Sequence, residues 1–135
     1  MTEQTLVLIK PDAMERDLSD EIIEIYKENG LKIKKSRTLH ANEETAKQHY
    51  FELKDKPFFH EVIDYITRSP LMALILEGED AISRVRELNG ATNPNKAKEG
   101  TIRYLYGRDG EVGENCVHAS DSPESAQREI NIWFK

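Results

Sequence analysis

Polar residues of types that bind and transfer phosphate gather in the second half of the chain, outside its regular hydrophobic patterns. Arg86 and Arg103 offer planar bidentate donors for phosphate oxygens, and Thr92 adds a hydroxyl. His118 is a competent nucleophile when neutral, and Glu129 lies on the helix predicted to follow it. These residue types therefore point to a site that holds phosphate groups and uses covalent catalysis.

Each of these residues, taken alone, also has a structural interpretation. A single Arg or Thr is usually a solvated side chain, and a histidine beside a strand is more often structural than catalytic. Tyr50 and Phe58 are also explicable as core aromatics, and Cys116 as a small buried hydrophobe. The combination, with Lys10 at the end of the first apolar run, favours a phosphate site. The remaining histidines carry no evident site: His40, His49 and His60.

Hydrophobic periodicity indicates which elements must position these residues. Apolar runs predict strands at 5–9, 31–39, 71–76 and 115–118. Helical patterns begin near 19, 42, 58, 80 and 122, with Ser19 expected at an N-cap and Pro123 early in the last helix. Lys10-Pro11-Asp12 is predicted to form a turn. Residues 90–115 are predicted to form a long loop without elements of its own, a kind of segment that is usually functional or disordered.

Strands and helices mix along the whole chain, without an internal repeat or linker. This order predicts a single domain over residues 1–135, an α+β ferredoxin-like sandwich whose four-stranded antiparallel sheet is covered by helices. The usual Gly-rich nucleotide motifs are absent, because neither G-x-x-x-x-G-K-[ST] nor G-x-G-x-x-G occurs. Fold class alone does not decide the chemistry.

Composition narrows the setting and the partners. The 135 residues carry a formal net charge of -6, so nucleic acid is an unlikely partner, since an acidic chain repels polyanions. One cysteine excludes an internal disulfide and any Cys-pair metal site. The sequence has neither a signal-peptide pattern nor an apolar run of ~20 residues that would span a membrane. We therefore expect a cytoplasmic protein.

Five segments carry a resemblance to a known family. They are TLVLIKPD at 5–12, KPFF at 56–59, GATNP at 90–94, GTIR at 100–103 and NCVHASDS at 115–122. In order and at this spacing, they resemble nucleoside diphosphate kinases over nearly the whole chain. The last segment is similar to the family's N-x-x-H-G-S-D signature.

The resemblance implies an activity and a role for each matching position. A phosphate would pass from a nucleoside triphosphate, mainly ATP, to a nucleoside diphosphate in a ping-pong reaction through phosphorylated His118. Glu129 would hydrogen-bond the other imidazole nitrogen, and Ser120 would support that contact. The remaining positions would bind nucleotide: Lys10 and Tyr50 at the transferring phosphate, Arg86, Thr92 and Arg103 at the phosphates behind it, Asn115 and Lys10 at the ribose, and Phe58 stacked on the base.

The same resemblance implies a cofactor and an assembly. Mg²⁺ would bridge the nucleotide phosphates with few or no protein ligands. The chain would form a homo-oligomer, a hexamer rather than a tetramer, because it ends at Lys135 without the longer tail of some family members.

Two departures from the family pattern leave alternatives open. Ala119 stands where the signature has glycine, which would forbid glycine-only backbone angles beside the nucleophile. Residues 104–114 also differ from the common family sequence. A non-catalytic, nucleotide-binding regulatory protein of the same fold is therefore the main alternative. An unrelated ferredoxin-like interaction module is a further one.

Overall fold

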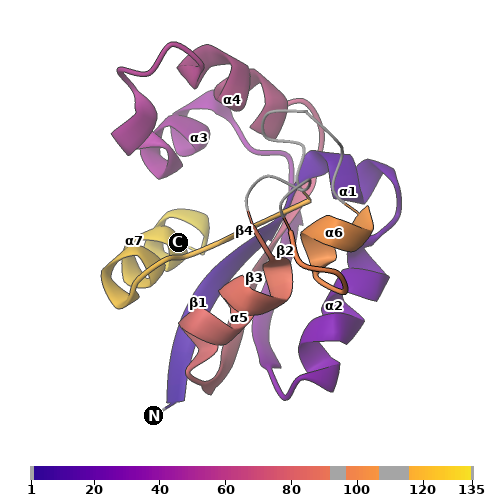
Figure 1. Cartoon of the computed structure of the whole chain (residues 1–135). Helices are drawn as coiled ribbons and strands as arrows, with labels where there is room; N and C mark the ends of the chain where they lie inside the picture. The colour runs from indigo at the N-terminus through magenta and orange to yellow at the C-terminus, as the bar shows by residue number, and fades with distance from the viewer. Residues whose placement is uncertain (1, 92–96, 107–115, 135) are drawn as a thin grey trace.

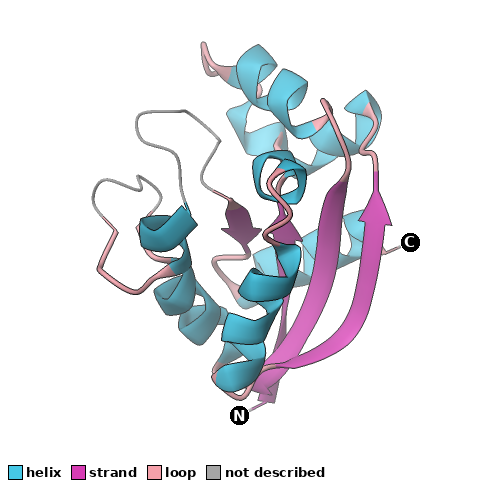
Figure 2. Cartoon of the chain, turned by 90° about the vertical axis from the view of Figure 1, so that its right-hand side faces the viewer, coloured by secondary structure: helices cyan, strands magenta, loops and turns pink. Residues whose placement is uncertain are grey.

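The computed structural model describes residues 2–91, 97–106 and 116–134. Its strands are β1 (Thr2–Ile9), β2 (Lys32–Leu39), β3 (Leu71–Glu79) and β4 (Val117–Ala119). They form one antiparallel sheet in the order β2-β3-β1-β4. Figure 2 shows the strands as arrows with helices packed around them. The predicted ferredoxin-like α+β fold is confirmed, with β1 in the interior of the sheet.

Helices cover both faces of this sheet (Figure 1). One layer contains α1 (Pro11–Glu15), α2 (Ser19–Glu28), α5 (Ala81–Asn89) and α6 (Ile102–Tyr106). The other contains α3 (Glu43–His49), α4 (Phe59–Ile66) and α7 (Pro123–Trp133), with a short 3-10 turn at Phe51–Leu53. Among the described residues, no helix combines the length and apolar character needed to cross a bilayer.

Alternation along β1 divides the core into two layers. Val7 and Ile9 join the cluster under α2 and α5, whereas Leu6 and Leu8 join the cluster under α4 and α7. Successive side chains of a strand point to opposite faces, so a strand covered on both sides must be apolar at every position. The uninterrupted run from Leu6 to Ile9, fully buried in the structure, follows this rule.

Two short helices correct the sequence-based prediction. Residues 11–15 form α1 rather than a simple turn, with Pro11 at its start, where a missing N–H costs nothing. Residues 102–106 form α6 within the segment expected to lack elements, and Ile102 is fully buried. Ser19 is the first helical residue of α2 rather than its N-cap, which is Leu18.

The N-terminal ends of α3 and α7 do have side-chain caps. The Asn42 side chain accepts a hydrogen bond from the Thr45 N–H at 2.8 Å, and the Ser122 hydroxyl accepts one from the Ser125 N–H at 3.1 Å. Such caps satisfy backbone donors that the helix itself leaves without partners. The Ser122 cap fixes the start of α7 at Pro123, four residues after the end of β4, and so sets which α7 side chains face that strand.

Candidate active site

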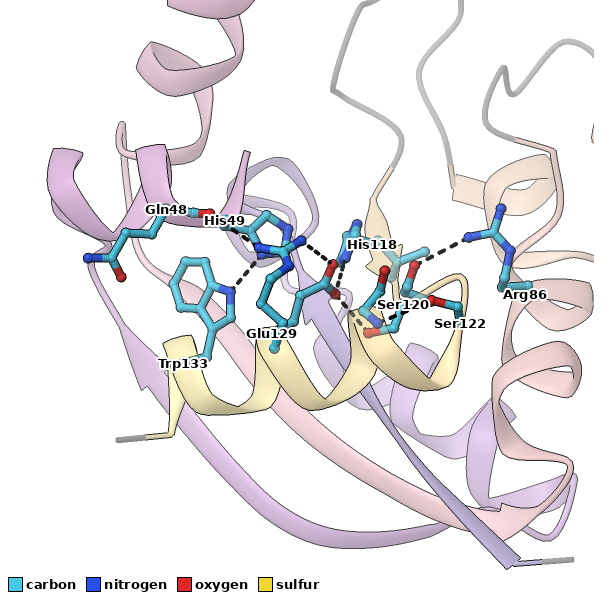
Figure 3. Close-up of polar contacts among 12 residues, drawn as sticks. Gln48, His49, Arg86, His118, Ser120, Ser122, Glu129 and Trp133 are labelled. Carbon is cyan, nitrogen blue, oxygen red and sulfur yellow. Dashed lines mark hydrogen bonds and ion pairs between the residues drawn. The ribbon is translucent and has the colours of Figure 1, made fainter. Parts of the chain in front are cut away.

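A pocket of about 270 Å³ lies where the end of β1, the end of α3, α6, β4 and α7 meet. It is polar, and its lining contains one lysine and three arginines together with three carboxylates, Glu52, Asp121 and Glu129. Figure 3 shows His118, Glu129 and His49 converging on one side of this region and Arg86 approaching from the other. The lining includes six of the residues predicted from sequence: Lys10, Tyr50, Arg86, Arg103, His118 and Glu129.

A hydrogen-bonded triad of side chains orients His118. Its Nε2 lies 2.8 Å from Glu129 Oε1, which also accepts a hydrogen bond from the Ser120 hydroxyl at 2.7 Å. Because a carboxylate only accepts, Nε2 carries the proton and Nδ1 carries the lone pair. The Ser120 N–H donates to the Leu6 carbonyl at 3.1 Å, which ties the triad to the central strand. Nδ1 is therefore the nucleophilic nitrogen of this ring.

Burial keeps His118 neutral near pH 7. Only 23% of the side chain is exposed, and its removal from water lowers the pKa of His118 below the ordinary value of 6.5. The hydrogen bond to Glu129 and the charge of that carboxylate act in the opposite direction and raise this pKa. The positive charges of Lys10 and Arg103 lower the pKa further. A neutral imidazole has an available lone pair, so His118 needs no additional base.

The cations of the pocket also hold the backbone around the nucleophile. Arg103 donates from Nη1 to the Gly90 carbonyl and from Nη2 to the Val117 carbonyl, each at 2.7 Å. Arg86 donates to the Ala119 carbonyl at 3.3 Å. Among the described residues, Arg103 Nε has no hydrogen-bond partner although it is buried. The guanidiniums therefore fix β4 from both sides and provide a positive field beside His118.

Lys10 reaches this field from the end of β1. The residue is 8% exposed, and burial, followed by the charge of Arg103, lowers its pKa to about 8. Asp12 and Cys116 act in the opposite direction. Lys10 is therefore still mostly protonated at neutral pH, where it adds to the attraction for an anion.

His49, which the sequence analysis set aside, belongs to the site. Its ring lies edge-on to the His118 ring with 4.5 Å between the centroids, and its Nδ1 accepts a hydrogen bond from Trp133 Nε1 at 3.0 Å. Burial, followed by the nearby charge of His118, lowers its pKa well below 6.5. One nitrogen or oxygen each of His49, His118 and Glu129 lie within 4.8 Å of one another. The contacts of these residues with Trp133 and Ser120 already give this group a role without a metal.

Other predicted residues fall outside the pocket lining or outside the described residues. Ser120 is buried behind Glu129, as expected for a supporting contact. Phe58 does not line the pocket and is 37% exposed. Thr92 and Asn115 lie outside the described residues. The structure adds Arg128 to the lining, a residue whose place on a helix gave no sequence signal of its own.

The structure describes one of the two departures from the family pattern, Ala119, in full and the other, residues 104–114, in part. Ala119 lies in β4 opposite Val7 and has no positive φ, so the backbone here does not require glycine. The left-handed backbone occurs instead at Cys116, with φ 73°. Of the altered segment, residues 104–106 continue α6, and residues 107–114 lie outside the described residues.

Comparisons with known proteins agree on one family. The family model described as Nucleoside diphosphate kinase matches residues 3–135. A nucleoside diphosphate kinase of Clostridium perfringens is 59% identical over 98% of this chain and 91% of its own length. One of Thermococcus kodakarensis is 49% identical over 98% of this chain and 77% of its own length.

Solved structures give the same result for the fold. The Aquifex aeolicus nucleoside diphosphate kinase superposes with a TM-score of 0.95 at 40% identity, covering 100% of this chain and 96% of that one. A halophilic nucleoside diphosphate kinase from Halobacterium salinarum, solved in complex with CDP, also gives 0.95, at 39% identity, covering 100% and 89%.

Proposed function

The chain belongs to the nucleoside diphosphate kinase family, enzymes that pass the γ-phosphate of a nucleoside triphosphate to a nucleoside diphosphate, and we propose that His118 carries that phosphate between the two nucleotides. The observation that carries this proposal is the 2.8 Å contact between His118 and Glu129 at one side of a pocket that also contains Lys10, Arg86 and Arg103. Without the pair of His118 and Glu129, the pocket could bind phosphate but would have no group to accept it covalently.

In the first half of the reaction, the Nδ1 lone pair attacks the γ-phosphorus. The bond from that phosphorus to the bridging oxygen breaks, and the nucleoside diphosphate leaves with the electron pair. The imidazole gains positive charge, which Glu129 stabilises through the 2.8 Å contact to Nε2. In the second half, a terminal phosphate oxygen of another diphosphate attacks the phosphorus, and the N–P bond breaks. One site used twice gives ping-pong kinetics.

The cations would act on charge that spreads over phosphate oxygens in a loose transition state. We propose that Lys10 and the Tyr50 hydroxyl contact the transferring phosphate, because both line the pocket beside His118. Burial and the charge of Glu129 raise the pKa of Tyr50, so its hydroxyl stays a donor. Arg86 and Arg103 would hold the phosphates behind it.

The remaining contacts concern the nucleoside and the inner phosphates. We propose that Thr92 adds a hydroxyl to the phosphates held by the arginines, and that Asn115 joins Lys10 at the ribose. Phe58, 37% exposed, would stack on the base. Stacking without hydrogen bonds to the base edge accepts purines and pyrimidines alike, because every base has an aromatic face.

We propose Mg²⁺ as the cofactor, carried into the site on the nucleotide. The side chains of the pocket fit this arrangement, since the cations can hold the phosphates that carry the ion and Glu129 is already an acceptor for His118 and Ser120. Two further carboxylates, Glu52 and Asp121, also line the pocket. Mg²⁺ prefers oxygen ligands and is commonly bound through substrate phosphates and water. The ion would neutralise part of the phosphate charge. Chelation should abolish transfer, and added Mg²⁺ should restore it.

We further propose that the chain works in the cytoplasm as a homo-oligomer, with six copies favoured over four. The outer edge of β2 supports an assembly, because an exposed edge strand offers unpaired backbone groups that a second copy can cover. Nucleoside di- and triphosphates are the proposed partners, and nucleic acid and membranes are not. Light scattering after size exclusion would measure the number of copies.

A two-step label transfer tests the central proposal. The protein is incubated with Mg²⁺ and γ-labelled ATP, freed of nucleotide, and then given GDP or UDP. We expect label on the wild type that is lost in acid but survives base, and that moves to the acceptor. His118→Ala should take no label, whereas His60→Ala, which alters an exposed histidine on α4, should match the wild type. Binding of ATP without label on the wild type would instead favour the regulatory alternative.

A further inference from the structure

Asp12 is a buried carboxylate that the proposed mechanism does not use. It lies in α1, two residues after Lys10, and is 1% exposed. Burial of a charge is costly unless it is paired and hydrogen-bonded. Its partners come from two distant parts of the chain. Tyr65 of α4 donates its hydroxyl to Asp12 Oδ1, and the Cys116 N–H donates to Oδ2 at 3.2 Å.

These contacts join the two segments that carry the reacting groups. The Lys10 N–H donates to the Cys116 carbonyl at 2.8 Å, so Asp12 and Lys10 hold the same residue from either side of its backbone. Cys116 has φ 73°, a conformation that costs a residue other than glycine roughly 1–2 kcal/mol and that persists only when surrounding contacts impose it. His118 follows two residues later, in β4.

Tyr65 of α4 connects Asp12 to a third part of the chain. Its hydroxyl also accepts the Asp12 N–H at 3.4 Å, and Lys10 Nζ lies 5.9 Å from the centroid of its ring. The residue is 8% exposed. A single carboxylate therefore connects α1, α4 and the segment before β4, at the point where Lys10 enters the pocket.

We propose that Asp12 is a positioning residue for phosphate transfer, which holds Lys10 and the backbone before His118 in their working arrangement and places a buried negative charge beside Lys10. This inference rests on the proposed function of the pocket. Tyr65 belongs to the same set of contacts, because its hydroxyl donates a hydrogen bond to the Asp12 carboxylate and so orients it.

The charge balance around Lys10 explains why this carboxylate matters. Burial and Arg103 lower the pKa of Lys10 to about 8, and Asp12 is the first of the two groups that raise it. Removal of the Asp12 charge therefore lowers the pKa further, so Lys10 loses its proton at a lower pH. The titratable side chains around Lys10 come from α1, α3, α4, α6, the segment before β4, β4 and α7. They are Asp12, His49, Tyr65, Arg103, Cys116, His118 and Glu129.

The test separates the charge of Asp12 from its hydrogen bonds. In Asp12→Asn, the amide oxygen can still accept from Cys116, and the amide nitrogen can donate to a rotated Tyr65 hydroxyl, so only the charge is lost. Tyr65→Phe removes the hydroxyl and keeps the charge. Asp20→Asn, an exposed position on α2, is the control for net charge. The measurement is kcat/KM for ATP from pH 6.5 to 9, which reports groups of the free enzyme.

A nearby opposite charge shifts a pKa by ~1–3 units, so a shift of about one unit is expected in Asp12→Asn. With a starting pKa of about 8, this predicts about eightfold lower kcat/KM at pH 8.5 and less than about 1.5-fold at pH 6.5. Asp20→Asn should follow the wild-type profile. Tyr65→Phe should lower kcat by roughly tenfold or more at every pH, since one hydrogen bond to the charged Asp12 carboxylate, of ~1.5–3 kcal/mol, is lost.

The ionisation of Lys10 is measured without turnover by NMR of protein with ¹³C-labelled lysine, its signal assigned by its absence in Lys10→Arg. Its titration should move to lower pH in Asp12→Asn alone. An unmoved Lys10 titration, a loss in Asp12→Asn that is equal at all pH values, or unchanged kcat in Tyr65→Phe would each overturn the proposal. A wild type that transfers no phosphate would refute the proposed function, and the NMR titration would still decide whether Asp12 controls Lys10.

Discussion

Replacing Glu129 with glutamine should slow the phosphorylation of His118 and, at the same time, move its acid limb to lower pH. Glu129 Oε1 accepts from His118 Nε2 at 2.8 Å and from Ser120 at 2.7 Å, and the residue is 5% exposed. A glutamine oxygen can accept both hydrogen bonds, so the ring orientation is retained. What is lost is the negative charge next to a ring that becomes positive during attack.

The size of the effect follows from that single change. A hydrogen bond to a charged group contributes ~1.5–3 kcal/mol and a neutral one ~0.5–1.5 kcal/mol. A difference of about 1.5 kcal/mol in the transition state corresponds to roughly tenfold in rate. The plateau rate of phosphorylation should therefore fall by about an order of magnitude in Glu129→Gln.

The pH dependence has a definite sign. Attack requires neutral His118, so the rate falls as the pH drops through the pKa of this ring. Burial already lowers that pKa below 6.5, and Glu129 opposes the lowering. Without the carboxylate the pKa falls further, so the limb moves to lower pH and the deficit of the variant shrinks in acid.

Quenched-flow measurement of labelled phosphoenzyme in a single turnover, from pH 5 to 8, gives both quantities. Glu124→Gln is the matched control, an exposed position on the same helix, and should behave as the wild type. A Glu129→Gln limb displaced to higher pH, or a plateau rate equal to that of the control, would refute the assignment of Glu129 as the group that stabilises the charged ring.

Three further predictions concern the backbone at two positions and the thiol of Cys116. Ala119→Gly should leave the transfer rate within about twofold of wild type and destabilise the fold by ~0.5–1 kcal/mol in urea titration, because β4 has ordinary strand geometry here. Asp80→Gly should stabilise by roughly 1 kcal/mol in the same titration, since Asp80 has φ 50° and makes no side-chain cap. Cys116 should resist iodoacetamide at pH 8 in the native protein and react in denaturant, because burial raises the pKa of its thiol to about 12; rapid native labelling would contradict this.

Sequence reasoning found the elements whose stabilising contacts repeat along the chain. The buried run of β1 and the apolar face of α4 are readable because burial is periodic there. The two missed helices, α1 and α6, have five residues each, too few for a period to show. They are stable through tertiary contacts, such as the burial of Ile102 and the hydrogen bonds of Asp12, which no local pattern reveals.

In the site, too, the sequence reveals the residues that a local pattern marks and not those that depend on tertiary contacts. His118, Arg86 and Arg103 stood out because they break the hydrophobic pattern, and the structure brings all three to one pocket. His49 and Asp12 did not stand out. His49 occupies a place on an apolar helical face and Asp12 lies beside a proline, so each resembles an ordinary structural residue. Their importance comes from Trp133 and Cys116, partners more than 80 residues away along the chain.

The shortness of β4 has a consequence for how the arginines should be interpreted. Within the described part of the chain, the three residues of β4 pair with β1 alone, so few backbone hydrogen bonds hold this strand, and side-chain donors supplement them. Arg103 donates to the Val117 carbonyl, just before His118, and to the Gly90 carbonyl at the end of α5, and Arg86 donates to the Ala119 carbonyl just after His118. The guanidiniums that we propose as phosphate ligands are thus the ones that hold β4 on either side of His118. Loss of either should lower the rate of phosphorylation at saturating nucleotide as well as the affinity, and a variant that weakened affinity alone would show that the two duties are separable.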